Sequence, residues 1–136
     1  MIRKEPNVPR KSAIRTEEAP APFAGAPYSQ AIRIGDLVFV SGQIPLRPGG
    51  SQLVGPGIAE QTEQVFANLR AILEAAGSGL DRLVKTTVFL KDLGDFAAMN
   101  EVYKKHAGDT PPARSTVQVA AIPAGALVEI EAVAHL

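Results

Sequence analysis

Three charged residues in the last quarter of the sequence are placed where they could do chemistry. Arg114 follows a Pro-Pro-Ala break and opens a predicted strand, and its guanidinium presents a planar fork that suits a carboxylate. Glu129 and Glu131 alternate with apolar residues in the last predicted strand, so both carboxylates share one face and could act as general acid and base. On spacing alone, a surface arginine or a structural ion pair explains Arg114 more simply, and a solvated strand face explains the two glutamates.

The distance between these residues along the chain limits how they could act together. If the last two predicted strands (residues 114–122 and 127–134) pair as a simple hairpin, Glu129 lies opposite Ala120. Ala120 is separated from Arg114 by about 20 Å, at the usual rise per residue of a strand. The two residues of one chain then cannot share a small substrate. A site that uses both is expected to be assembled across subunits.

Four further residues are candidates for contacts with a ligand. Tyr28 follows a proline at the expected start of the ordered domain, where a tyrosine packed on the sheet is an equal alternative. Ser41 and Gly42 interrupt an apolar strand, and a glycine there permits either close approach of a ligand or a bulge, of which the bulge alone is commoner. Asn100 lies inside a predicted helix, where a buried polar bridge to a loop is the simpler interpretation.

The composition argues against several other kinds of site. The 136 residues include no cysteine and two histidines, which removes disulfides, thiolate nucleophiles and zinc sites that need sulfur. We assign no role to His106 or His135. The 14 basic and 14 acidic side chains balance, and with few aromatic residues this argues against a nucleic-acid partner. No apolar run approaches the ~20 residues of a membrane span, so no membrane partner is expected.

A short arm is expected to precede one folded domain. Residues 1–18 hold five basic and three acidic side chains without apolar periodicity, which predicts a flexible N-terminal arm over 1–18 and a domain over 19–136. The arm also lacks the apolar segment of a secretory signal. This predicts a cytoplasmic protein.

Apolar spacing and glycine or proline breaks predict the elements of the domain. They are, in order, strands 29–34 and 37–44, a helix from 58 to about 77, strand 83–90, helix 95–107, and strands 114–122 and 127–134. The order is therefore β-β-α-β-α-β-β.

Alternation along the strands divides the sheet into two faces. It places Ile32 and Val117 on the face that the two helices cover, and Phe39, Arg114 and Thr116 on the other. No further element remains to cover this second face, which mixes apolar and charged residues. The pattern predicts an oligomer in which these faces meet around polar clefts.

Six blocks of residues, in order, carry a resemblance to a known family. They are PYSQA (27–31), VSGQIP (40–45), VKTTVFL (84–90), DFAAMN (95–100), PARS (112–115) and IEAVA (130–134). With them the chain from about residue 22 to 134 resembles the RidA/YjgF family of reactive-intermediate deaminases. The resemblance implies an α+β fold like that of the bacterial chorismate mutase type, with a mixed sheet and two helices on one face. It also implies a homotrimer with the other face inward and clefts between subunits.

The resemblance implies an activity as well. Members of the archetypal subgroup hydrolyse 2-imino acids, such as 2-iminobutanoate and 2-iminopropanoate, to 2-keto acids and ammonia without metal or cofactor. By resemblance, Arg114 grips the substrate carboxylate, and Glu129 orients the attacking water and handles its protons. The residues expected to contact the substrate or border its cleft are Tyr28, Ser41, Gly42, Asn100 and Thr116.

Alternatives stay open within the same resemblance. A non-catalytic or regulatory paralogue could bind small carboxylates in the same cleft, and some relatives are described as endoribonucleases or translation inhibitors. A chaperone-like role is a further possibility. The sequence departs from the family pattern at Ala26, which separates Gly25 from the usual Pro-Tyr, and at Thr116, where many members have cysteine.

Overall fold

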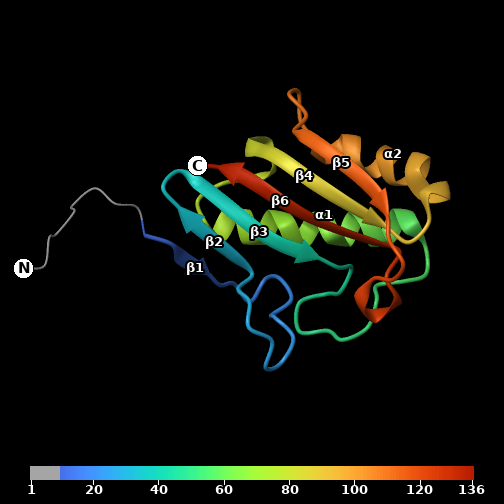
Figure 1. Cartoon of the computed structure of the whole chain (residues 1–136), viewed down its shortest axis with the longest axis horizontal. Coiled ribbons are helices and arrows are strands. Elements are labelled where there is room, and N and C mark those ends of the chain that lie inside the picture. The colour runs from blue at the N-terminus through green and yellow to red at the C-terminus, as the bar shows by residue number, and fades with distance from the viewer. Residues whose placement is uncertain (1–9) are drawn as a thin grey trace, which may run out of the picture.

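The computed structural model describes residues 10–136, which form one mixed sheet and two helices (Figure 1). The strands are β1 (Ser12–Ile14), β2 (Ala31–Ile34), β3 (Leu37–Gln43), β4 (Leu83–Leu90), β5 (Ala113–Gln118) and β6 (Val128–His135). They lie side by side in the order β1-β2-β3-β6-β4-β5. The helices are α1 (Ile58–Ala75) and α2 (Phe96–His106), and short 3-10 turns span Leu80–Arg82, Leu93–Asp95 and Pro123–Gly125.

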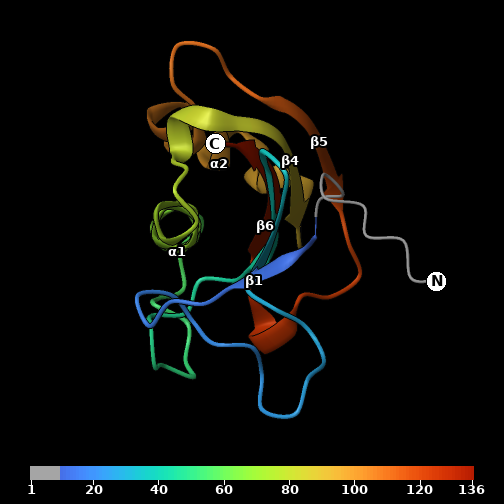
Figure 2. The same cartoon turned by 90° about the vertical axis from the view of Figure 1, so that its left-hand side faces the viewer.

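Both helices pack on the same face of the sheet (Figure 2). Glu60 stabilises the start of α1 by accepting a hydrogen bond from the N–H of Gly57 at 2.7 Å. Gly77 follows the end of the helix with a φ of 87°, a conformation that costs glycine little. The buried side of α1 repeats at helical spacing and forms the core with β3, β4 and β6: its largest members are Val65, Phe66, Leu69, Ile72 and Leu73. The α+β class, the mixed sheet and the two helices on one face are confirmed.

Each helix connects two parallel strands. β3 and β4 both pair antiparallel with β6, so they run parallel to each other, and α1 joins them. β4 and β5 pair directly in parallel, and α2 joins them. The last two strands therefore lie on either side of β4 and do not form the hairpin considered from the sequence. Glu129 lies opposite Phe89 of β4, and not opposite Ala120.

In β2 and β5 the side chains lie on the opposite faces of the sheet from those predicted. Arg114 and Thr116 pair with buried residues of β4 and lie on the face that the helices cover. Val117 and Ile32, expected on that face, pair instead with Phe89 and Phe39 on the open face. The assignment was wrong because β5 is an edge strand and β2 is next to the other edge. Solvent reaches both faces there, so apolar alternation does not report which face is buried.

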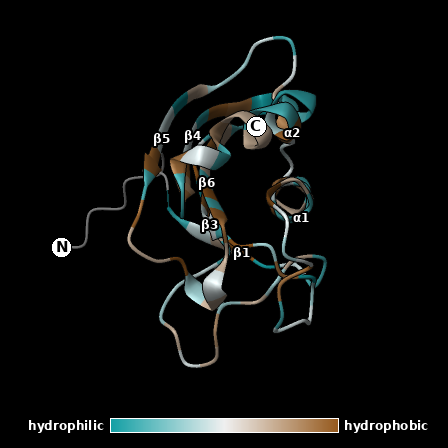
Figure 3. Cartoon of the chain, turned by 90° about the vertical axis from the view of Figure 1, so that its right-hand side faces the viewer, coloured by the Kyte–Doolittle hydropathy of each residue, from teal (hydrophilic) through white to brown (hydrophobic). Residues whose placement is uncertain are grey.

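The face without helices is open in the single chain. Figure 3 shows α1 and α2 together on one side of the sheet, and no α-helix of residues 10–136 covers the other side. Large apolar side chains are exposed on this open face, including Leu37 at 40%, Phe39 at 45% and Val117 at 43%. Exposed apolar groups gathered in this way are typical of a surface that binds a partner.

Part of the predicted flexible arm is a strand. Ser12–Ile14 pairs antiparallel with β2, with Ser12 opposite Arg33 and Ile14 opposite Ala31. The sequence predicted no strand here, because three residues are too few to show an alternating pattern. Residues 1–9 of the predicted arm lie outside the described residues.

Candidate functional site

Four of the predicted site residues surround one hollow near the end of β3. Tyr28, Ser41, Gly42 and Glu129 all line a cavity of about 410 Å³. Glu129 and Glu131 make part of its lining acidic, while apolar side chains come from the loop before β2 and the segment after β3. The remaining lining residues are Pro20, Ala21, Phe23, Gln30, Gln43, Ile44, Leu46 and Pro123. The hollow thus offers both a carboxylate that can react and an apolar surface.

Gly42 allows the carboxylate of Glu129 to reach this hollow. The pairing of β3 with β6 shifts between Val40 and Gln43, and such a shift is a bulge, which bends the strand and changes where its neighbours point. A Cβ added at Gly42 would overlap Oε2 of Glu129 and would lie 2.9 Å from its Cδ and 3.2 Å from its Cγ. The carboxylate therefore occupies space that any other residue at position 42 would fill.

The two carboxylates of the hollow differ in their surroundings. Burial raises the pKa of the Glu129 carboxyl above its ordinary value, and the negative charge of Glu131 raises it further. Glu131 is more exposed and accepts a hydrogen bond from Oγ1 of Thr87 at 3.0 Å. Unequal environments separate the roles of paired carboxylates. Of the two, Glu129 is the one whose raised pKa suits it to taking up and returning a proton.

The polar groups of Ser41 and Tyr28 are engaged within the chain. Ser41 donates its hydroxyl to the carbonyl of Ser29 at 2.6 Å and its N–H to the carbonyl of Gln30 at 2.9 Å. The hydroxyl of Tyr28 accepts the N–H of Phe23 at 3.1 Å, and the tyrosine is 44% exposed. Ser41 thus holds the loop before β2, while Tyr28 keeps a hydroxyl proton that it can donate to a ligand at the rim.

The other three predicted residues gather at a separate place, where β5 meets α2. Nη1 of Arg114 donates to Oδ1 of Asn100 at 2.7 Å, and the guanidinium carbon lies 4.7 Å from the centre of the Tyr103 ring. The other N–H groups of Arg114 meet no acceptor within residues 10–136. Oγ1 of Thr116 is shielded from solvent and has no hydrogen-bond partner in the same part of the chain. Asn100 and Tyr103 therefore fix the guanidinium and leave several donors for an anion.

Arg114 and Glu129 of one chain point to opposite sides of the sheet. Glu129 is paired with Phe89 of β4, and Phe89 is paired with Val117 of β5. Two strand spacings and three residues along β5 put the Cα atoms of Arg114 and Glu129 about 14 Å apart. The guanidinium lies against α2, and Arg114 does not line the hollow around Glu129. One small molecule cannot contact both residues within a single chain.

Comparison with known proteins identifies the family. The sequence model of a family described as "Endoribonuclease L-PSP" matches residues 16–136. The chain belongs to this family, which is also called RidA/YjgF. Within residues 10–136 of this RidA-family chain, neither helix is both long enough and apolar enough to cross a membrane.

Individual members of the RidA family are similar over nearly the whole chain. A RutC family protein of Pyrococcus abyssi is 50% identical over 125 residues, which cover 92% of this chain and 97% of that protein. The 2-iminobutanoate/2-iminopropanoate deaminase of Mus musculus is 46% identical over 124 residues, covering 91% and 90%. The crystal structure of E. coli TdcF with bound serine matches with a TM-score of 0.84 at 41% identity, covering 92% and 98%.

One wall of the hollow was not foreseen from the sequence. Pro20, Ala21 and Phe23 line it, and Gln30 holds the segment that carries them through hydrogen bonds to its main chain. A signal was present in the PYSQA block of the RidA-family motif, where Gln30 directly precedes an apolar strand. A glutamine so placed is buried only if its amide finds partners.

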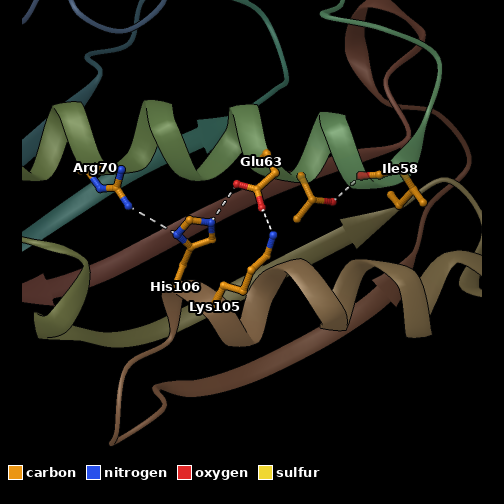
Figure 4. A network of polar contacts seen from close by, with 6 residues as sticks. Ile58, Glu63, Arg70, Lys105 and His106 are labelled. Atoms are coloured by element: carbon orange, nitrogen blue, oxygen red, sulfur yellow. Dashed lines mark hydrogen bonds and ion pairs between the residues drawn. The ribbon is translucent and has the colours of Figure 1, made fainter.

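A polar cluster between the two helices accounts for His106 (Figure 4). Nε2 of His106 lies 3.1 Å from Oε2 of Glu63, and its Nδ1 lies 3.4 Å from Arg70. Lys105 pairs with Glu63 at 2.6 Å, and its hydrogen bond is the main cause that lowers the pKa of Glu63. The His106 ring also stacks on Phe66 at 4.7 Å. The cluster joins α1 to α2, and the described chain holds no group of three His, Cys, Asp or Glu side chains arranged for a metal.

Proposed function

We propose that the chain hydrolyses reactive 2-imino acids, such as 2-iminobutanoate and 2-iminopropanoate, at clefts between the subunits of a homotrimer. The products are a 2-keto acid and ammonia. The observation that carries the proposal is the division of the site into two halves. Arg114 offers free donors for an anion on one side of the sheet, and Glu129 offers a proton-accepting carboxylate on the other. A substrate with a carboxylate next to a C=N bond needs both halves.

The proposed reaction begins when water attacks the protonated imine. Arg114 binds the substrate carboxylate through charge-assisted hydrogen bonds and so fixes the C=N carbon. The ionised Glu129 takes a proton from the water as the water oxygen bonds to that carbon. It then gives the proton to the amino nitrogen, and the C–N bond breaks with its electron pair on nitrogen. The new hydroxyl passes its proton to Glu129 to give the ketone, and the departing ammonia takes that proton as ammonium, which leaves Glu129 ionised again. These steps need positioning and one proton carrier.

The proposed assembly follows from the positions of the two halves. The face that carries Glu129 would meet the β5–α2 edge that carries Arg114 of a neighbour. Contact between two unlike surfaces is heterologous, and it closes into a ring when the rotation permits. Such contacts would also bury Leu37 and Phe39, which are exposed in the single chain. We take three subunits for the ring from the family resemblance.

The family's description as an endoribonuclease suggests RNA as an alternative substrate. The charge of the hollow favours a small substrate instead. Among the described residues its lining includes two carboxylates and no lysine, arginine or histidine. Proteins that hold single-stranded nucleic acid rely on positively charged grooves with stacking aromatic residues. A carboxylate-binding protein without turnover would share the Arg114 half and is distinguished by the assay below.

Mixing of subunits tests the proposal. Arg114→Ala lacks one half of the site and Glu129→Gln lacks the other, so each alone is expected to be inactive. When the two variants are refolded together in equal amounts and assemble at random, each cleft takes its Arg114 half from one subunit and its Glu129 half from the next. Both halves of a cleft are then wild type in about one case in four. The measurement is removal of 2-iminobutanoate, which threonine dehydratase generates in situ and semicarbazide traps. We expect the mixture to recover about a quarter of wild-type activity.

A matched control uses a partner variant that lacks both halves of the site. The double variant Arg114→Ala/Glu129→Gln, refolded with Arg114→Ala, is expected to recover nothing. If the wild type is active but the complementary mixture is not, the site lies within one chain and the shared cleft is wrong. If the wild type removes no imine across several imino acids, the deaminase proposal is wrong, and calorimetry with 2-keto acids then asks whether the cleft only binds carboxylates.

A further inference from the structure

The segment from Pro20 to Tyr28, which we call the strap, separates two hollows. On one side lies the cavity with Glu129, and on the other lies a larger open hollow of about 970 Å³ that β1 and the chain after it border. Both are lined by Pro20, Ala21, Phe23 and Tyr28. The strap is therefore a single layer of chain with unfilled space on both sides, and its position depends on the bonds that hold it.

Gln30 supplies bonds to the chain that leads into the strap and one bond to its first residue, Pro20. Its side chain is buried, with a relative exposure of 3%. Its Oε1 accepts the N–H of Thr16 at 2.8 Å, and its Nε2 donates to the carbonyls of Thr16 at 3.0 Å, Ala19 at 3.3 Å and Pro20 at 2.9 Å. One side chain thus holds the chain from Thr16 to the start of the strap. Because Nε2 donates to three main-chain carbonyls, loss of the amide would leave all three without this partner, in a buried place at Ala19 and in a partly buried one at Thr16 and Pro20.

The strap also has bonds of its own that determine where Phe23 lies. The N–H of Ala26 donates to the carbonyl of Phe23 at 2.9 Å and closes a four-residue β-turn. Gly25, the third residue of this turn, has a φ of 77°, a positive value that glycine adopts readily. The N–H of Phe23 donates to the Tyr28 hydroxyl at 3.1 Å. Phe23 itself is 52% exposed and lines both hollows. It is the largest apolar side chain of the strap on the cavity with Glu129.

We propose that Gln30 is a positioning residue that holds the strap against the cavity, and that Phe23 on the strap sets which substrate side chains are accepted. This rests on the proposed function. Arg114 of a neighbour and Glu129 would fix the carboxylate and the C=N carbon, so the substrate's side chain is the part left to contact apolar lining. The strap supplies Pro20, Ala21 and Phe23 to that lining. Gln30 also lines this cavity, but main-chain groups of Thr16, Ala19 and Pro20 engage its amide, so we assign it a role through the strap alone.

Two variants and a matched control test this. Gln30→Met keeps the length of the side chain and removes its hydrogen bonds, while Phe23→Ala removes the ring. Gln61→Met is the control, because Gln61 is equally buried and holds other main chain, at Gly55 and Leu127, without lining the cavity. The readout is kcat and KM for imines made by an amino acid oxidase from alanine and from leucine. A single apolar group in a pocket changes discrimination by about 10–200-fold.

We expect Phe23→Ala to shift the leucine-to-alanine ratio of kcat/KM by about tenfold toward the larger substrate. Gln30→Met is expected to raise KM for both imines about fivefold or more, with kcat within about threefold, and to move the ratio in the same direction. Gln61→Met should leave the ratio at the wild-type value even if it lowers stability. An unchanged ratio in both strap variants would overturn the role in specificity.

A second measurement tests whether Gln30 holds the strap without relying on the proposed enzymatic activity. Chymotrypsin cleaves after Phe23 when the strap leaves its place, so the rate of cleavage there reports the anchor without any turnover. We expect Gln30→Met to be cleaved at least about tenfold faster than the wild type, and Gln61→Met at the wild-type rate. If the wild type hydrolyses no imine, the proposed function fails, and this rate alone decides on Gln30. Equal cleavage of wild type and Gln30→Met would show that Gln30 does not hold the strap.

Discussion

One methyl group at Gly42 tests whether the position of the Glu129 carboxylate limits the proposed imine hydrolysis. In Gly42→Ala the new Cβ would overlap Oε2 of Glu129 and lie 2.9 Å from its Cδ. Carbon atoms in ordinary contact are about 3.5–4.0 Å apart, so the carboxyl carbon must withdraw by about 0.6–1.1 Å. A misplacement of about 1 Å at a reacting group can lower the rate about 10²-fold. We expect kcat for 2-iminobutanoate to fall on the order of 10²-fold in the semicarbazide assay.

The same substitution should leave the fold almost unchanged. The three heavy atoms nearest to the added Cβ all belong to the side chain of Glu129, which can turn away. We therefore expect the free energy of unfolding in urea to change by less than about 1 kcal/mol. Gly79→Ala is the matched control, because its Cβ would lie 2.7 Å from Oδ1 of Asp81, another carboxylate, away from the hollow. It should keep wild-type activity.

The result that refutes this reasoning is specific. If Gly42→Ala has a kcat within about twofold of wild type, the carboxylate tolerates the displacement and its position does not limit turnover. If activity and stability fall together, the loss reports the fold and not the carboxylate.

Four other outcomes follow from three residues. Because burial and Glu131 raise the pKa of Glu129, its ionisation opposes folding, so Glu129→Gln should have a higher Tm than wild type at pH 7 and the same Tm once the pH is below the ordinary carboxyl range. Wild-type kcat should rise with pH through that raised pKa, and a flat profile would contradict Glu129 as base. The pKa of Glu63 is lowered, chiefly by Lys105, so Glu63→Gln should lower Tm at neutral pH, with the difference shrinking as the pH falls through that lowered pKa. Tyr103→Phe removes the partner of the buried Thr86 hydroxyl, 2.6 Å away, and should destabilise the fold by about 1–3 kcal/mol in urea unfolding, whereas no change would mean that Thr86 finds another partner.

The elements were predictable where one face of each is buried. α1 shows apolar residues at helical spacing, and the structure gives it the predicted start at Ile58. The predicted strand 83–90 coincides with β4, whose Thr86, Val88 and Leu90 are buried in alternation. In both cases one face of the element is buried against a neighbouring layer, so apolar residues recur in the sequence at the period of the helix or strand.

The predictions failed where one-sided burial does not determine which residues are apolar. β5 is an edge strand with no fully buried residue on either face, so the faces of Arg114 and Val117 could not be read from apolar alternation. The pairing of β5 with β4 did have a signal, because a strand, a helix and a strand in succession are typical of a parallel crossover unit. The contact of Gly42 with Glu129 joins two strands and depends on a bulge. A bulge is a local shift in strand register, which cannot be predicted from the amino-acid composition.

The separation of Arg114 from Glu129 has a consequence for the chemistry that the sequence could not show. If the two lay within about 4 Å in one chain, they would form an ion pair, which would lower the pKa of the carboxyl and occupy the donors of the guanidinium. On opposite sides of the sheet they cannot neutralise each other, so Glu129 keeps a raised pKa and Arg114 keeps free donors. In the proposed ring a neighbour's Arg114 would offset part of that rise, and a bound substrate carboxylate would take up the guanidinium and restore the rise in full. Glu129 would thus be a stronger base with the substrate in place than without it.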